Sequence, residues 1–145
     1  MYYLASEQSF DSAHFLAGHE GKCKNIHGHR WRVVVKVKSK TLQTGNPYEG
    51  MIVDFAQLKE DIKTEADYFD HALLIEKNSL KISTLEALKD EGFRIVELDF
   101  RPTAERFAKY FYDRMVGKGY QVKSATIYET PNNYASYEED PDVTV

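Results

Sequence analysis

The stretch Cys23-Lys24-Asn25-Ile26-His27-Gly28-His29, followed by Trp31-Arg32-Val33-Val34-Val35-Lys36-Val37, decides how this chain folds. Its second half is rich in β-branched residues, which predicts a strand. If that strand already begins at His27, then His27 and His29 project from the same face. Neutral imidazole suits zinc, so the two histidines are a ready pair of metal ligands. The same spacing also fits histidines that only pack or decorate a surface.

A third ligand is needed, because a catalytic zinc ion usually takes three from the protein and leaves a fourth position for water or substrate. The other histidines of the chain are His14, His19 and His71. His14 lies where an antiparallel partner of the His29 strand would end. The sequence therefore predicts a zinc site made by His14, His27 and His29.

Cys23 is the only cysteine, and it lies four residues before His27. A structural zinc site would be expected to recruit more sulfur, so a lone thiol beside three histidines fits a reactive group better than a fourth ligand. The alternative is a small buried hydrophobic residue. The neighbouring residues Gly21, Lys22, Lys24 and Asn25 are those of a polar loop, which argues against burial.

Composition limits the class of protein. With 145 residues, of which 42% are hydrophobic, the chain predicts one domain, over residues 1–140, with a single core. No apolar run approaches the roughly 20 residues that span a bilayer, and the N-terminus lacks the pattern of a signal peptide, so we expect a cytoplasmic protein. A net charge of -4 argues against general nucleic-acid binding. The basic residues Lys22, Lys24, Arg30 and Arg32 around the histidines allow a small anionic substrate, or mark a solvated strand edge.

Hydrophobic periodicity predicts strands over residues 2–10, 29–38 and 123–130 and a short fourth strand through Tyr137. One helix is expected from Asp54, in a capping box with Gln57, to about residue 69, with an apolar stripe of Phe55, Leu58, Ile62 and Phe69. Pro102-Thr103 opens a second helix, with Ala104, Phe107, Ala108, Phe111 and Met115 as its stripe. This order predicts an α+β fold, a four-stranded antiparallel sheet with both helices on one face. Its open edges predict a closed oligomer.

Three further features complete the pattern. Residues 76–100 form a charged spacer, in which Ser83-Thr84-Leu85-Glu86 would cap a short helix ending near Gly92, and the tail from Glu138 is acidic. Asp70 and His71 are adjacent at the end of the first helix, where both are ordinary, although Asp70 would also suit a partner that sets the basicity of a working histidine. Glu129 lies at the end of a predicted strand, on the face that otherwise carries apolar residues. Its carboxylate must therefore be paired, exposed or engaged with a ligand.

The chain resembles the 6-pyruvoyl-tetrahydropterin and 6-carboxy-tetrahydropterin synthase family, which has the T-fold. The resemblance rests on Ser12-Ala13-His14, Gly21-Lys22-Cys23, His27-Gly28-His29, Val53-Asp54-Phe55 with Leu58-Lys59, Asp70-His71, Pro102-Thr103-Ala104-Glu105, and Tyr128-Glu129-Thr130 with Asn132-Asn133. It implies zinc on the three histidines, Cys23 as base, and Asp70 and His71 as aids to proton transfer. It also implies Glu129 as the anchor of the pterin ring, Thr103 in substrate binding, and a homohexamer of two trimers, closed into a barrel, with active sites between subunits.

Within the family, the three residues between Cys23 and His27 resemble the bacterial 6-carboxy-tetrahydropterin synthases of queuosine biosynthesis. We therefore expect conversion of 7,8-dihydroneopterin triphosphate into 6-carboxytetrahydropterin, with release of acetaldehyde and triphosphate. The ending Glu129-Thr130-Pro131-Asn132-Asn133 also resembles the pyruvoyl-forming enzymes of animals, so the pyruvoyl-forming reaction is a second hypothesis. A non-catalytic pterin or purine binder and a plain zinc hydrolase are a third and a fourth.

Overall fold

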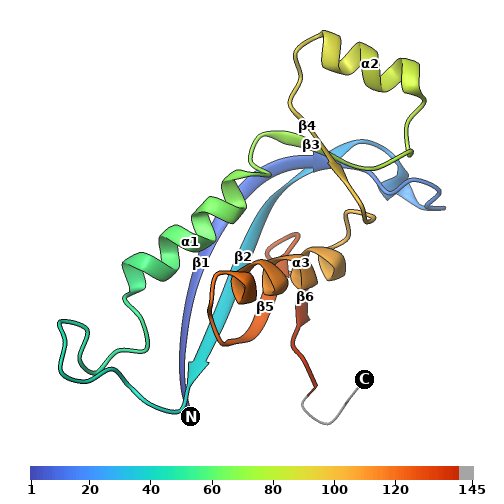
Figure 1. The fold of residues 1–145 in the computed structure, drawn as a ribbon. Coiled ribbons are helices and arrows are strands. Elements are labelled where there is room, and N and C mark those ends of the chain that lie inside the picture. The colour runs from blue at the N-terminus through green and yellow to red at the C-terminus, as the bar shows by residue number, and fades with distance from the viewer. Residues whose placement is uncertain (141–145) are drawn as a thin grey trace.

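The computed structural model describes residues 1–140. Its helices and strands follow the order of the chain (Figure 1): β1 Tyr2–His14, the 3-10 turn η1 Lys22–Lys24, β2 His27–Ser39, α1 Phe55–Asp67, β3 Ala72–Glu76, α2 Ile82–Asp90, β4 Ile95–Leu98, α3 Ala104–Gly117, β5 Val122–Tyr128 and β6 Tyr134–Tyr137. Within these residues no helix is long and apolar enough to cross a membrane. Residues 141–145 of the expected acidic tail lie outside the described residues.

The sheet has six strands in the order β4-β3-β1-β2-β5-β6, so the expected four-stranded sheet is corrected. β1 pairs antiparallel with β2, β2 with β5 and β5 with β6, which are the four strands that the sequence predicts. β3 adds to β1 in parallel and β4 adds to β3 in parallel, so the sheet is mixed. The edges formed by β4 and β6 are open in the single chain, and the closed oligomer remains a prediction.

β1 and β2 are the longest strands, and their register positions the histidines. The pairs run from Tyr2 opposite Ser39 to His14 opposite His27. Trp31, Val33, Val35 and Val37 of β2 are buried, as their alternation predicts. His27 and His29 continue that face toward the end of the strand, because side chains two positions apart point the same way.

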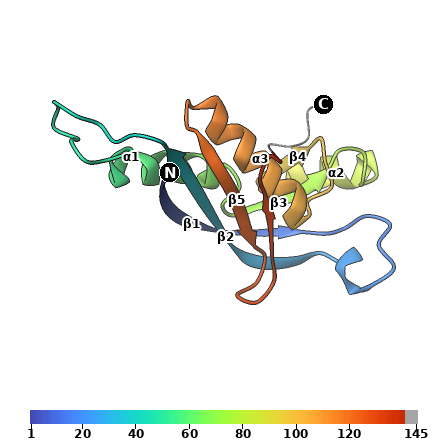
Figure 2. The ribbon, with the colours of Figure 1, turned by 90° about the horizontal axis from the view of Figure 1, so that it is seen from below.

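Helices α1 and α3 lie on the same side of β1 and β2 (Figure 2) and cover that face of the sheet. The predicted stripes supply the core: Leu58, Ile62 and Phe69 from α1 and the segment after it, and Ala104, Phe107, Ala108, Phe111 and Met115 from α3. Phe55 was expected in the stripe of α1, but as the first residue of the helix it is 58% exposed, and the buried face of α1 begins at Leu58.

Side-chain caps mark the two helix starts, at Asp54, which the sequence predicts as the N-cap, and at Thr103. The Asp54 carboxylate accepts from Ala56 N, and the Thr103 hydroxyl accepts from Arg106 N. The expected capping box does not form, because the Asp54 carboxylate accepts from Ala56 N and not from Gln57 N, and the side-chain amide of Gln57 donates to Asp61.

The 76–100 spacer folds into β4 and into α2, the short helix that the sequence predicts. The helix begins at Ile82 after Lys81, which forms no side-chain cap, so the expected cap at Ser83-Thr84 is wrong by two residues. None of the residues of α2 is buried, and the helix stands apart from α1 and α3 (Figure 1). β4 nevertheless belongs to the sheet, where Leu73 lies opposite Ile95.

Candidate metal centre and active site

Three imidazoles converge where β1 ends and β2 begins. The Nε2 atoms of His14 and His27 are 3.1 Å apart, and the ring centroids of the three histidines are 4.6 to 5.0 Å from one another. The fully buried ring of Trp31 lies edge-on beneath His14 and His29, at centroid distances of 4.9 and 5.4 Å. The strand register thus brings together the three histidines that the sequence selected, on a rigid apolar floor.

Backbone carbonyls orient two of these rings. His14 Nδ1 lies 2.8 Å from Pro102 O, and His27 Nδ1 lies 2.7 Å from Asn25 O. A carbonyl only accepts, so each Nδ1 carries a proton, and in a neutral ring the lone pair is then on Nε2. Two lone pairs 3.1 Å apart repel each other unless a cation lies between them. Ligand histidines are typically held through the second ring nitrogen in this way.

His29 provides the third nitrogen. Its Nε2 is buried and forms no hydrogen bond of acceptable geometry within the described chain, although a Glu129 oxygen lies 2.9 Å away. Burial lowers the pKa of His29, against the opposing charge of Glu129, so the ring is kept neutral. A neutral, buried nitrogen without a donor or acceptor of good geometry is what a metal ligand needs.

Glu129 is the fourth member of the cluster. One carboxylate oxygen lies 3.2 Å from His14 Nε2 and 2.9 Å from His29 Nε2, and the ligand atoms of all four residues lie within 4.8 Å of one another. The contact with His14, together with the neighbouring His29, lowers the pKa of the Glu129 carboxyl. This donor set, three nitrogens and one carboxylate, fits a zinc ion in composition and spacing, since tetrahedral zinc with bonds of about 2.0–2.1 Å separates its nitrogen ligands by about 3.3 Å.

Cys23 shares a pocket with this cluster. The cysteine lies on η1, half-exposed and with a free thiol, and its carbonyl accepts from Leu16 N at 2.8 Å. The pocket measures about 530 Å³ and is lined by Lys22, Cys23, His27, His29, Glu129, Thr130 and Asn133. The polar loop predicted around Cys23 is observed. Cys23, the Glu129 carboxylate and the imidazoles of His27 and His29 thus line one cavity of the size of a small molecule, and His14 lies next to it in the cluster.

Thr103 lies close by, but its hydroxyl has a structural partner. The side chain caps α3 and also lines a smaller pocket of about 180 Å³ that includes His14 and Glu129. Thr103 therefore borders the site, and its expected role in substrate binding remains a prediction.

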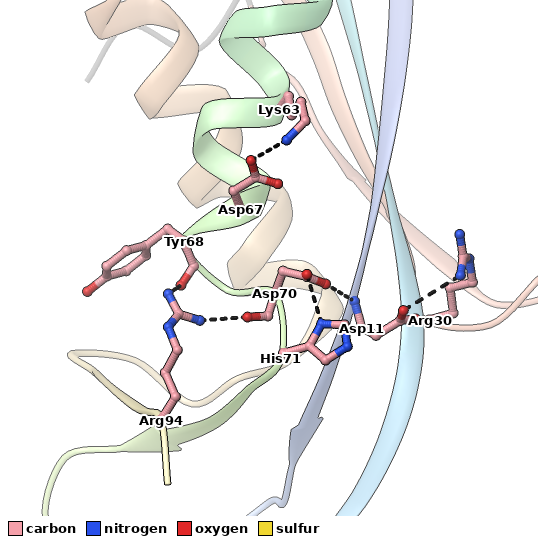
Figure 3. A network of polar contacts seen from close by, with 8 residues as sticks. All are labelled: Asp11, Arg30, Lys63, Asp67, Tyr68, Asp70, His71 and Arg94. Atoms are coloured by element: carbon pink, nitrogen blue, oxygen red, sulfur yellow. Dashed lines mark hydrogen bonds and ion pairs between the residues drawn. The ribbon is translucent and has the colours of Figure 1, made fainter. Parts of the chain in front are cut away.

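Asp70 and His71 do not line that pocket and belong to a separate polar network. The Asp70 carboxylate accepts from Asp11 N at 2.9 Å with one oxygen and contacts His71 Nδ1 at 2.8 Å with the other (Figure 3). The hydrogen bond from Asp11 N lowers the pKa of Asp70. The side chain of His71 is 78% exposed, so its Nε2 edge faces outward. The two residues do form a contacting pair, which the sequence left open, but in one chain they do not line the cavity of Cys23.

The backbone oxygens of Pro102 and Asn25 are functional groups that sequence reasoning missed, because main-chain atoms leave no signal in residue type. Trp31, two residues after His29 on β2, packs against the His29 ring as part of the floor of the site, a contact that sequence reasoning also missed.

A sequence model of the 6-pyruvoyl tetrahydropterin synthase family matches residues 3–140. The chain belongs to this family. The match covers nearly all of the described residues, so the resemblance inferred from the motifs is confirmed.

Relatives within the 6-pyruvoyl tetrahydropterin synthase family carry a more specific name. A 6-carboxy-5,6,7,8-tetrahydropterin synthase of Haemophilus influenzae is 31% identical over 96% of this chain and 100% of that protein. A protein of the same name from Synechocystis is 33% identical, over 79% of this chain and 97% of its own length.

Solved structures support the T-fold. The 6-pyruvoyl tetrahydropterin synthase of Caenorhabditis elegans superposes with a TM-score of 0.66 at 24% identity, over 96% of each chain. An uncharacterized protein of Wolinella succinogenes superposes with a TM-score of 0.76 at 22% identity, over 96% of this chain and 98% of that one. At these identities the likeness establishes the family fold.

Proposed function

We propose that this chain is a 6-carboxy-5,6,7,8-tetrahydropterin synthase that converts 7,8-dihydroneopterin triphosphate into 6-carboxytetrahydropterin, releasing acetaldehyde and triphosphate, in the queuosine pathway. The observation that carries the proposal is the pocket that Cys23 lines together with His27, His29 and Glu129, three of the four residues of the cluster completed by His14. The names of the bacterial relatives point to the same product.

We assign a zinc ion to His14, His27 and His29. Bound there, zinc would act as a Lewis acid on the hydroxylated side chain of the substrate and acidify its C-H and O-H bonds. The chain itself supplies the groups that hold the three imidazoles. Trp31 and the carbonyls of Pro102 and Asn25 keep the three rings in place.

Cys23 is the proposed base. Cys23 lies on a loop between two lysines and lines the same pocket as His27 and His29. The thiolate would accept the proton released from the substrate side chain. Glu129 would orient the pterin ring by accepting hydrogen bonds from its N-H groups.

Asp70 and His71 are proposed to move protons for the Cys23 of a neighbouring subunit. Their pairing fixes the His71 tautomer, since Nδ1 contacts Asp70 and Nε2 is left outward. The pair lies outside its own chain's pocket, and the sheet has open edges at β4 and β6. Both features support a homohexamer of two trimers, in which a second copy completes each site. A single free cysteine agrees with a reducing compartment, and we keep the cytoplasm as the proposed location.

The test is incubation of the purified protein with 7,8-dihydroneopterin triphosphate, followed by assays for acetaldehyde and triphosphate. We expect the two products in equal amounts. Triphosphate without acetaldehyde would replace the proposal with the pyruvoyl-forming reaction, which the same site and the solved relatives favour as second candidate. Release of neither product, with tight binding of a pterin, would indicate a non-catalytic binder.

A further inference from the structure

The carbonyls after α1 have an unusual partner. α1 ends at Asp67 without a basic residue in its last turn. Carbonyl groups at a helix C-terminus lack partners within the helix and carry partial negative charge. Here the guanidinium of Arg94, from beyond α2, donates from Nη1 to Asp70 O at 2.7 Å and from Nη2 to Tyr68 O (Figure 3). One side chain thus serves as the C-terminal cation of α1.

Arg94 also holds the chain beyond His71. Its carbonyl oxygen accepts from Leu73 N at 3.0 Å, where β4 starts to pair with β3. The side chain of Arg94 therefore binds the backbone of Tyr68 and Asp70, and the backbone of Arg94 binds that of Leu73. His71 lies between these attachments.

The conformation of His71 needs such support. Its φ is 55°, in the left-handed region that residues with a Cβ seldom adopt. Backbone in this region persists only where its surroundings hold it. On one side β1 supports this backbone through two hydrogen bonds. His71 N donates to Asp11 O at 2.6 Å, and Asp11 N donates to Asp70 Oδ1 at 2.9 Å. On the other side the support comes from Arg94.

We propose that Arg94 is a positioning residue, which fixes the imidazole of His71 by holding the backbone of Asp70 and Tyr68. The inference rests on the proposed role of Asp70 and His71 in proton transfer. The proposal gives the 76–100 segment a function. The segment leads the chain through α2 to Arg94, whose guanidinium then contacts the backbone beside Asp70 and His71.

The experiment compares Arg94→Ala, Arg94→Lys, Lys63→Ala and His71→Ala with the unchanged protein. Lys63 is the matched control, since it is a cation near the same end of α1 that pairs with Asp67 and does not touch the 68–73 backbone. We expect Arg94→Ala to lower kcat about 10-fold with KM within twofold, because displacing a catalytic group by about 1 Å costs up to about 100-fold. Arg94→Lys, which keeps a cationic donor, should recover most of kcat. Lys63→Ala should change neither constant.

Hydrogen-deuterium exchange of the peptide that contains residues 68–73 gives a readout independent of turnover. We expect Arg94→Ala to accelerate exchange there, with the core peptides of β2 and α3 unchanged, and Lys63→Ala to leave it as it is. Unchanged exchange and kcat in Arg94→Ala would overturn the proposal, as would an equal loss in Lys63→Ala. Full activity of His71→Ala would instead overturn the proposed role of His71, a failure visible without any Arg94 variant.

Discussion

His14 and His27 face each other with their Nε2 atoms 3.1 Å apart, while the Nδ1 atom of each ring contacts a backbone carbonyl. Neutral rings held in this way present two lone pairs to each other. The arrangement is stable only around positive charge, which a proton or a metal ion provides. The orientation of the rings by their carbonyl partners thus prepares the site for a cation.

Removal of one ring should remove the metal. We expect one zinc ion per chain in the unchanged protein, and His27→Ala to lower zinc affinity by at least about 100-fold, since two remaining imidazoles bind weakly. His19→Ala is the control, because His19 contacts Gly21 N and lies outside the cluster. Elemental analysis after dialysis against a weak chelator measures both. Equal zinc content in the two variants would count against the site.

Cys23→Ala should separate metal binding from chemistry. The thiol lies in the pocket but not in the four-residue cluster, so the variant should keep its zinc and lose turnover by about 100-fold or more, as expected when a positioned base is removed. Zinc content and product formation are measured on the same sample. Unchanged turnover would remove Cys23 from the reaction, and loss of zinc would make it a ligand.

Much of this site could be predicted from the sequence. The H-x-H spacing on a predicted strand placed His27 and His29 on one face, and the expected end of an antiparallel neighbour selected His14, which the structure pairs with His27. The strand parity of Glu129 indicated a carboxylate that needs a partner. Its contact with the imidazoles depends on how β5 ends against β2, which residue type does not encode.

Other features were beyond sequence reasoning for physical reasons. β3 and β4 are runs of five and four residues that pair in parallel, so neither alternation nor a hairpin turn marks them as sheet. The contact of Arg94 with Asp70 O joins a side chain to a main-chain atom 24 positions away. The adjacency of Asp70 and His71 did not reveal that their side chains touch, because neighbours in a chain often point apart.

Glu65 should matter for stability and not for chemistry. This buried carboxylate on α1 accepts from Arg114 Nε and Nη2 on α3, at 2.9 and 3.1 Å, and lies 3.3 Å from Lys118 Nζ. Glu65→Ala should lower the free energy of unfolding by about 1–3 kcal/mol, the usual cost of losing hydrogen bonds to a charged group. Lys109→Ala, which breaks an exposed pair with Asp113, should cost about 0.5 kcal/mol or less. Urea unfolding compares them, and equal effects would show that Glu65 does not link the helices.

Asp70 should give a pH-dependent contribution to stability. Its pKa in the folded chain is lowered from 3.8, mainly by the hydrogen bond from Asp11 N. The ionised carboxylate therefore favours the folded state at pH values above 3.8, and this advantage disappears as pH falls through the lowered value. The difference in unfolding free energy between the unchanged protein and Asp70→Asn should accordingly shrink as urea titrations move from pH 7 toward pH 3. A difference that stays constant would mean that the bond does not favour the ionised form.

X-ray absorption at the zinc edge of the metal-loaded protein tests the central claim most directly. Three imidazoles converging on one ion, with Cys23 left free, predict three histidine nitrogens at about 2.0–2.1 Å and no sulfur at about 2.3 Å. A sulfur ligand, or fewer than three imidazoles around the zinc, would contradict this account of the site.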